Sequence, residues 1–101
     1  GVIKFKNDFF EEHKEIFQEI SNAQHPHTLY IGCSDSRIVP NLITKTMPGE
    51  VFVVRNIANM VPPYEENNNS FRCTASIIEY AVNVLEVENI VVCGHSNCGG
   101  C

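Results

Sequence analysis

The order of apolar and polar residues predicts helices that alternate with short apolar strands. Residues 4–21 place apolar side chains on one helical face and most charged side chains on the other. Residues 74–85 repeat apolar side chains at helical spacing, and Pro40 suits the first turn of a shorter helix over 40–45. The polar run within residues 62–70 indicates a surface loop.

Three short runs read as strands, over residues 28–32, 51–55 and 89–93. The first ends at Cys33, and the third is nearly all apolar, which is typical of a strand that is covered on both faces. Short apolar strands that alternate with helices predict an α/β fold with a mostly parallel sheet flanked by helices. We expect residues 1–101 to form a single domain, because a chain of 101 residues is too short for two.

The charge balance limits the classes of partner. Twelve acidic and 7 basic residues give a net charge of −5, which repels phosphate backbones and anionic lipid. We therefore expect neither a nucleic-acid nor a membrane partner. The amino terminus shows no secretory signal, so we expect a cytoplasmic location, with a periplasm or organelle reached by a removed leader left open. Because the chain lacks an initiator methionine and stops abruptly at Cys101, we expect a fragment.

Five cysteines at irregular spacing favour reduced thiols over a disulfide framework. Cys73 and Cys93 lie within or beside apolar runs, and we interpret them as small buried apolar residues. In a reducing compartment, the remaining cysteines point to metal binding or catalysis.

Two polar segments each follow a predicted strand. They are Cys33-Ser-Asp-Ser-Arg37 and Gly94-His-Ser-Asn-Cys-Gly-Gly100. Ligands bind outside the carboxyl ends of parallel strands, so Cys33, His95 and Cys98 are expected to converge there. Two thiolates and one imidazole suit zinc and leave a fourth position for water or substrate. Spacing alone favours zinc and unrelated buried thiols equally.

Asp35 and Arg37 stand two residues apart beside this candidate site. Their pairing would fix the direction of the carboxylate next to a metal. The alternative is a plain local salt bridge, which is worth under about 1 kcal/mol when exposed.

Together these motifs closely resemble the beta-class carbonic anhydrases. The likeness covers roughly residues 24–100 and includes, between the two polar segments, Met47-Pro-Gly-Glu50, Val53-Val-Arg-Asn-Ile-Ala-Asn59, Val61-Pro-Pro63 and Ile78-Glu-Tyr80. The resemblance implies a zinc enzyme that reversibly hydrates carbon dioxide to bicarbonate and a proton, by attack of zinc-bound hydroxide. It also implies a homodimer or a higher homo-oligomer.

The resemblance further implies roles for individual residues. Cys33, His95 and Cys98 match the zinc ligands. Asp35 and Arg37 match the catalytic dyad, in which the arginine orients the carboxylate. In family members that close at low pH, the residue matching Asp35 becomes the fourth zinc ligand.

The substrate pocket is also implied by the resemblance. Gln24 is similar to a glutamine that binds substrate across a dimer interface, and the backbone N–H of Gly99 matches a donor to bicarbonate. Phe52, Ile57 and Tyr80 match the apolar lining for carbon dioxide. Closing, bicarbonate-regulated members generally carry tryptophan where this chain has Tyr30, so Tyr30 together with Gln24 favours the open type.

Two alternatives stay open. The first is a catalytically impaired zinc-binding fragment of the same family, since Gln24, Phe52 and Tyr80 depend on a partner subunit there. The second is a thiol redox protein that uses the C-x-x-C pair Cys98 and Cys101. Redox chemistry gives no role to Asp35 or His95, and zinc content separates the two classes.

Overall fold

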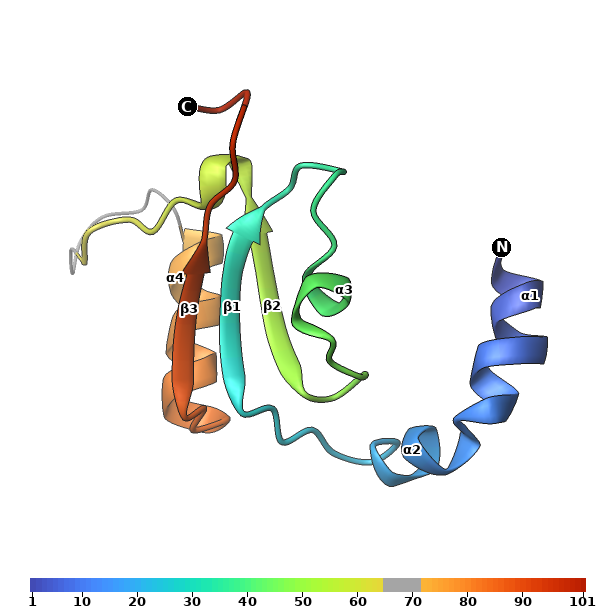
Figure 1. Cartoon of the computed structure of the whole chain (residues 1–101). Coiled ribbons are helices and arrows are strands. Elements are labelled where there is room, and N and C mark those ends of the chain that lie inside the picture. Colours follow the sequence, from blue (N-terminus) through green and yellow to red (C-terminus); the bar gives the residue numbers. More distant parts are fainter. Residues whose placement is uncertain (65–71) are drawn as a thin grey trace.

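The described residues form a sheet of three parallel strands. The computed structural model describes residues 1–64 and 72–101. The central strand β1 (Thr28–Cys33) lies between β2 (Val51–Asn56) and β3 (Asn89–Cys93), and both neighbours run parallel to it (Figure 1). The strands are in register at their carboxyl ends, where Cys33 pairs with Asn56 and Gly32 pairs with Cys93. The predicted parallel α/β fold is confirmed, and the carboxyl ends of all three strands lie at the same edge of the sheet.

The core lies between the sheet and the helix that precedes β3. That helix consists of α4 (Arg72–Glu79), which continues as a π-helical segment, η3 (Tyr80–Val84). The buried cluster of this core consists of Leu29, Ile31, Val54 and Ala81, with Phe52, Ile77, Ile78 and Val87 packed against them. Alternate residues of a strand share a face, so Cys33 lies on the same face as this core. Burial of β1 therefore fixes where the Cys33 thiol stands.

The other predicted elements agree in outline with the structure. The helix predicted over 74–85 begins earlier, at Arg72, and its second half is the π-helical segment. The short helix α3 (Pro40–Thr44) starts with proline and ends at Lys45, whose φ of 52° is left-handed. The loop predicted over 62–70 lies mostly outside the described residues.

The N-terminal residues form an arm that stands apart from the sheet (Figure 1). It contains α1 (Val2–Phe5), the π-helical segment η1 (Lys6–Phe10) and α2 (Lys14–Glu19). The prediction of one continuous helix over 4–21 is wrong, because the backbone breaks at His13 with φ −115° and ψ 26°. The arm's aromatic rings instead pack on one another, with Phe5 and Phe9 stacked at 5.6 Å between ring centres.

Two burial predictions are also wrong. Ile90, Val91 and Val92 of β3 are 43–53% exposed, because the core cluster takes its strand residues from β1 and β2 and none from β3. Cys73 is exposed on α4 rather than buried, and Cys93 is half-buried.

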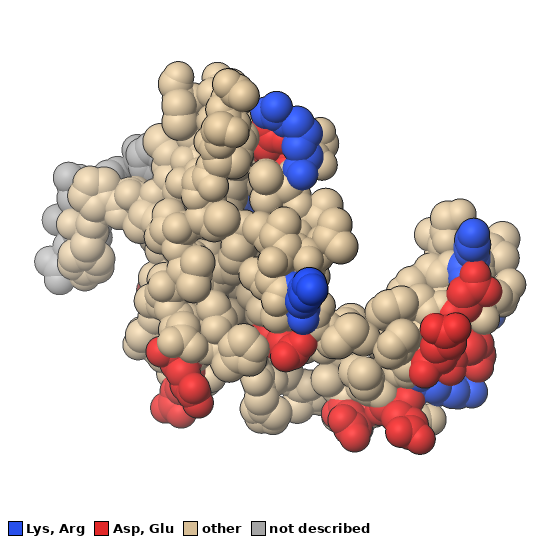
Figure 2. All heavy atoms as spheres, viewed as in Figure 1, with Lys and Arg blue, Asp and Glu red and all other residues tan. Residues whose placement is uncertain are grey.

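Acidic side chains gather on the arm (Figure 2). In the described ranges, no helix has both the length and the apolar character needed to cross a bilayer.

Candidate metal centre

The carboxyl edge of the sheet brings two thiols and one imidazole together. Cys33 ends β1, whereas His95 and Cys98 belong to the loop that follows β3. One ligand atom from each of these three residues lies within 4.8 Å of the other two. The two sulfur atoms are 3.8 Å apart. The predicted convergence thus follows from the parallel pairing of β1 and β3.

The His95 ring has one nitrogen committed and one available. Nδ1 lies 2.8 Å from the carbonyl oxygen of Ser96, and because a carbonyl only accepts, Nδ1 carries the proton. Nε2 then holds a lone pair, and it is buried without a hydrogen-bond partner in the described structure. A metal-binding histidine is held in this way, with its second nitrogen donating to an oxygen.

The spacing of the sulfur atoms fits tetrahedral zinc. Two thiolates that each lie about 2.3 Å from a tetrahedral ion stand about 3.8 Å apart. The Cys33 and Cys98 sulfurs are separated by that distance. With the free Nε2 of His95 as a third donor, the arrangement can hold one zinc ion and leave a fourth coordination position.

The two thiols ionise differently in the metal-free chain. The His95 ring, followed by main-chain N–H donors, lowers the pKa of Cys33 to about 6. The Gly100 N–H lowers the pKa of Cys98, but desolvation and the neighbouring thiols outweigh it, so the net shift is upward. The Cys33 thiolate in turn raises the pKa of His95. Cys33 is therefore the ligand that is ready as a thiolate near neutral pH.

Asp35 is held by Arg37 through three hydrogen bonds. The Arg37 backbone N–H and Nε both donate to Oδ1 at 2.9 Å, and Nη2 donates to Oδ2 at 2.7 Å. The Arg37 guanidinium keeps the pKa of Asp35 far below its usual range. Oδ2 also faces the ring, 3.7 Å from Nε2 of His95. A carboxylate that stays ionised is thus fixed beside the metal-binding group while remaining outside it.

Comparison with known proteins identifies the family. A sequence profile described as carbonic anhydrase matches residues 28–101. A carbonic anhydrase of Helicobacter pylori strain J99 is 46% identical over 101 residues, which cover 100% of this chain and 45% of that protein. The solved structure of the beta-carbonic anhydrase CcaA matches with a TM-score of 0.90 at 45% identity, over 98% of this chain and 43% of that one. This chain belongs to the beta-carbonic anhydrase family.

A second group of solved relatives supports the same placement. Two tetrameric beta-carbonic anhydrases from Sordaria macrospora match with a TM-score of 0.80 at 43% identity, over 94% of this chain and 45% of the solved chain. The chain therefore spans less than half the length of these relatives.

The structure separates the predicted substrate-binding residues into two groups. Ile57 and Gly99 lie at the carboxyl edge with the ligands, since Ile57 directly follows β2 and Gly99 follows Cys98. Phe52 lies near the start of β2 and packs on Tyr80 of η3, with 5.8 Å between ring centres. Gln24 is exposed and precedes β1, so a strand of about 15 Å or more separates it from Cys33. One chain alone does not bring Gln24 to the ligands.

Further contacts at this edge were not predicted. Arg55 donates to the carbonyl oxygen of Cys33 at 2.9 Å, and Arg37 Nη2 donates to that of Asn97 at 3.1 Å. The Ala58 N–H also helps to stabilise the Cys33 thiolate. Main-chain partners leave no residue-type signal in a sequence. The one available signal was Arg55, a charged residue that follows four apolar residues in β2.

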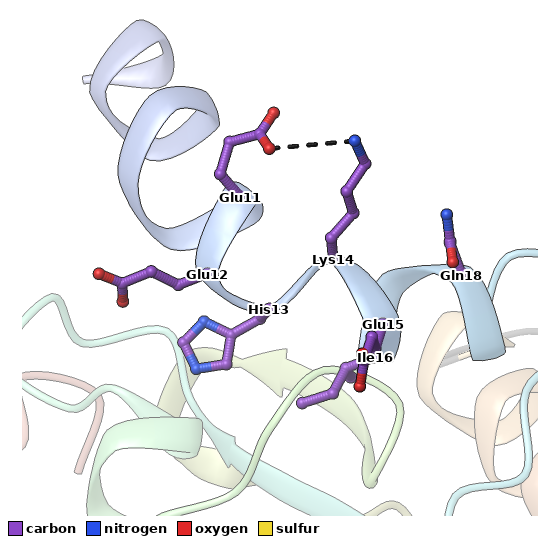
Figure 3. Close-up of a pocket in the computed structure, with 7 residues that line it drawn as sticks. All are labelled: Glu11, Glu12, His13, Lys14, Glu15, Ile16 and Gln18. Carbon is purple, nitrogen blue, oxygen red and sulfur yellow. Dashed lines mark ion pairs between the residues drawn. The ribbon is translucent and has the colours of Figure 1, made fainter.

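A pocket elsewhere on the molecule has no link to this site. It lies along the arm and is lined by Glu11, Glu12, His13, Lys14, Glu15, Ile16 and Gln18 (Figure 3). Glu11 and Lys14 pair there at 3.9 Å on the surface. None of the predicted site residues lines this pocket, so the candidate site is the group at the carboxyl edge of the sheet.

Proposed function

We propose that this chain supplies the zinc site and catalytic dyad for the reversible hydration of carbon dioxide to bicarbonate and a proton. The observation that carries the proposal is the meeting of His95 with two thiols, one ligand atom of each residue lying within 4.8 Å of the others, while Nε2 of His95 is buried without a hydrogen-bond partner in the described residues. Membership of the beta-carbonic anhydrase family supports the reaction class.

The proposed zinc ligands are Cys33, His95 and Cys98. When bound, zinc supplies a Lewis acid that lowers the pKa of a water molecule, to about 7 in the three-histidine carbonic anhydrase that is the usual reference. Two thiolates cancel the formal charge of the zinc ion, so this site would be a weaker Lewis acid than one with three neutral imidazoles. A hydrogen-bond acceptor that orients the water is therefore more important here.

Asp35 is the group that gives this help. It stays ionised because Arg37 binds both of its oxygens, so it accepts a hydrogen bond and does not donate one. With zinc held by the three ligands, the Asp35 carboxylate would accept a hydrogen bond from the reacting water and so fix its orientation toward carbon dioxide. Since both Asp35 oxygens are engaged by Arg37, we propose the open form of the site, with Asp35 joining the zinc only in a closed form.

The substrate pocket is proposed to be shared between subunits. Gly99 offers its N–H to bicarbonate, and Phe52, Ile57 and Tyr80 provide apolar surface. Gln24 lies away from the ligands of its own chain, which supports its use across an interface in a homodimer or higher homo-oligomer. The tetrameric relatives from Sordaria macrospora support such an assembly.

We also propose that residues 1–101 act as one domain of a protein that works in the cytoplasm. Two free thiols in close contact, Cys33 and Cys98, suit a reducing compartment. The net charge of −5 supports the expectation that neither nucleic acid nor membrane is a partner.

A stopped-flow assay of carbon dioxide hydration, with a pH indicator, tests the proposal on the zinc-loaded chain. We expect zinc-dependent turnover, its near-complete loss in Asp35→Ala, and unchanged zinc content in that variant. Asp8→Ala, which removes a carboxylate from the arm, is the matched control. Full activity in Asp35→Ala would contradict the role of the dyad, and zinc binding without turnover in the wild type would favour the impaired-fragment alternative.

The redox alternative makes a different prediction. Cys98 and Cys101 lie in one turn, where the Cys101 N–H donates to the Cys98 carbonyl oxygen at 3.3 Å. A working dithiol needs no metal, so reversible disulfide chemistry in a zinc-free chain would favour this alternative.

A further inference from the structure

We propose that Arg55 is a positioning residue, whose guanidinium holds the main chain of residues 33–38 in the conformation that presents Cys33 and Asp35. The proposal rests on the zinc site proposed above. It concerns how this chain shapes that site, and it assigns a function to a residue that is neither a ligand nor part of the dyad.

Two nitrogen atoms of Arg55 bind three carbonyl oxygens of one segment. Nε donates to Cys33 at 2.9 Å, and Nη2 donates to Asp35 at 2.7 Å and to Ile38 at 2.8 Å. The segment crosses a turn in which the Ile38 N–H donates to the Asp35 carbonyl oxygen at 3.2 Å. Arg55 thus contacts the main chain at the ligand, at the carboxylate and at the far end of the turn.

The same segment is hydrogen-bonded to β2 and to the loop that follows β3. On the β2 side, the Ser34 N–H donates to the Asn56 carbonyl oxygen at 2.8 Å, next to Arg55. On the β3 side, Arg37 reaches the Asn97 carbonyl oxygen at 3.1 Å, in the loop that carries His95 and Cys98. Removal of Arg55 takes away three hydrogen bonds on the β2 side and leaves the Ser34–Asn56 bond there. The Cys33 and Asp35 side chains would then lose their fixed direction relative to the second ligand loop.

The contacts require an arginine. Within the described residues, Arg55 donates hydrogen bonds to carbonyl oxygens and not to a carboxylate, so these contacts do not neutralise an acidic side chain. A guanidinium is planar and offers several N–H groups in a fixed fork, whereas lysine offers a single charged atom. The substitution Arg55→Lys keeps the positive charge and removes the planar set of N–H donors. It therefore separates the contribution of the charge from that of the hydrogen-bond geometry.

Cobalt(II) is the probe, because its absorption reports ligand geometry without any turnover. The complete chain would be loaded with cobalt in the presence of a phosphine reductant, as wild type, Arg55→Gln, Arg55→Lys and Lys6→Gln. Lys6→Gln removes one positive charge from the arm and is the matched control. Cobalt affinity is measured by competition with a chelator, and the spectrum by the thiolate charge-transfer and d–d bands. Circular dichroism of the metal-free proteins checks the fold.

We expect Arg55→Gln to weaken cobalt binding by about tenfold or more, in the range found for residues that orient metal ligands. Its cobalt bands should also change in intensity. Arg55→Lys should resemble Arg55→Gln, and Lys6→Gln should match the wild type. A purely structural role would lower the unfolding temperature and leave the cobalt spectrum of the folded protein unchanged.

Two outcomes overturn the inference alone. One is wild-type affinity and spectra in a folded Arg55→Gln, and the other is full recovery in Arg55→Lys. If Arg55→Gln does not fold, the folded Arg55→Lys carries the test, and wild-type behaviour in it has the same meaning. A folded wild-type chain that binds no cobalt would overturn the proposed zinc site together with this inference.

Discussion

Replacement of Ile31 by alanine tests whether the central strand is the core that fixes Cys33. Ile31 is 1% exposed, and it stands two residues before Cys33 on the same face of β1. The change removes three carbons, each worth about 0.8 kcal/mol when fully buried, and leaves a cavity. Ile31→Ala should therefore lower the free energy of unfolding by about 2–5 kcal/mol. That is a large part of the roughly 5–15 kcal/mol that stabilises an ordinary domain.

Urea unfolding of the metal-free chain, followed by circular dichroism, measures this loss. Ile90→Ala is the matched control, because Ile90 has the same side chain and pairs with β1 from β3, yet it is 53% exposed. With about half of the transfer free energy and no enclosed cavity, Ile90→Ala should cost about 1 kcal/mol. An equal cost at the two positions, or a cost below about 1 kcal/mol at Ile31, would refute the assignment of the core.

Three further predictions concern the site and its surroundings. Cys98→Ala should lose zinc while Cys73→Ala, at an exposed thiol outside the group, keeps it; near-stoichiometric zinc in Cys98→Ala would contradict the ligand assignment. In the metal-free chain, NMR should show the pKa of His95 above 6.5 and a fall in Cys33→Ser, because the Cys33 thiol is the main cause of the shift. Because the pKa of His95 is higher in the folded chain than in the unfolded one, protonation of His95 stabilises the folded chain below pH 6.5, and this contribution to the free energy of unfolding is lost as the pH rises through the folded pKa. An unchanged His95 titration in Cys33→Ser would disprove the coupling between the two residues. Gly100→Ala should cost about 1–3 kcal/mol in urea unfolding, because its Cβ would stand 2.5 Å from Ile57 Cγ2 and 3.0 Å from Ala58 Cβ, whereas Gly99→Ala meets nothing within 4 Å and should cost less.

The sequence predicted the sheet well because the strands are short, apolar and bounded by turn residues. The strand that ends at Cys33 and the one that ends at Cys93 were both placed correctly, and parallel pairing then brings their following loops together. The convergence of Cys33, His95 and Cys98 was therefore predictable from topology before any contact was known. The pairing of Asp35 with Arg37 was also accessible, since the two residues are close in the chain, whereas their catalytic role stays a prediction from the resemblance.

Other features could not be read from residue types. The break at His13 lies inside a stretch that keeps helical periodicity, so the pattern gives no warning of it. The apolar content of β3 indicates that the strand needs cover, but it does not say which segment provides it. Arg55 acts on carbonyl oxygens, which every residue has, so its partners leave no signature. Gln24 lies at the other end of β1 from the ligands, and the periodicity of one chain carries no information on contacts between subunits.

The most direct test of the central claim is the zinc content of the folded chain, measured by plasma emission on protein purified in reductant and without chelator. The geometry of Cys33, His95 and Cys98 predicts one zinc per chain. A folded chain that contains no zinc, and takes up none when zinc is added, would contradict the account.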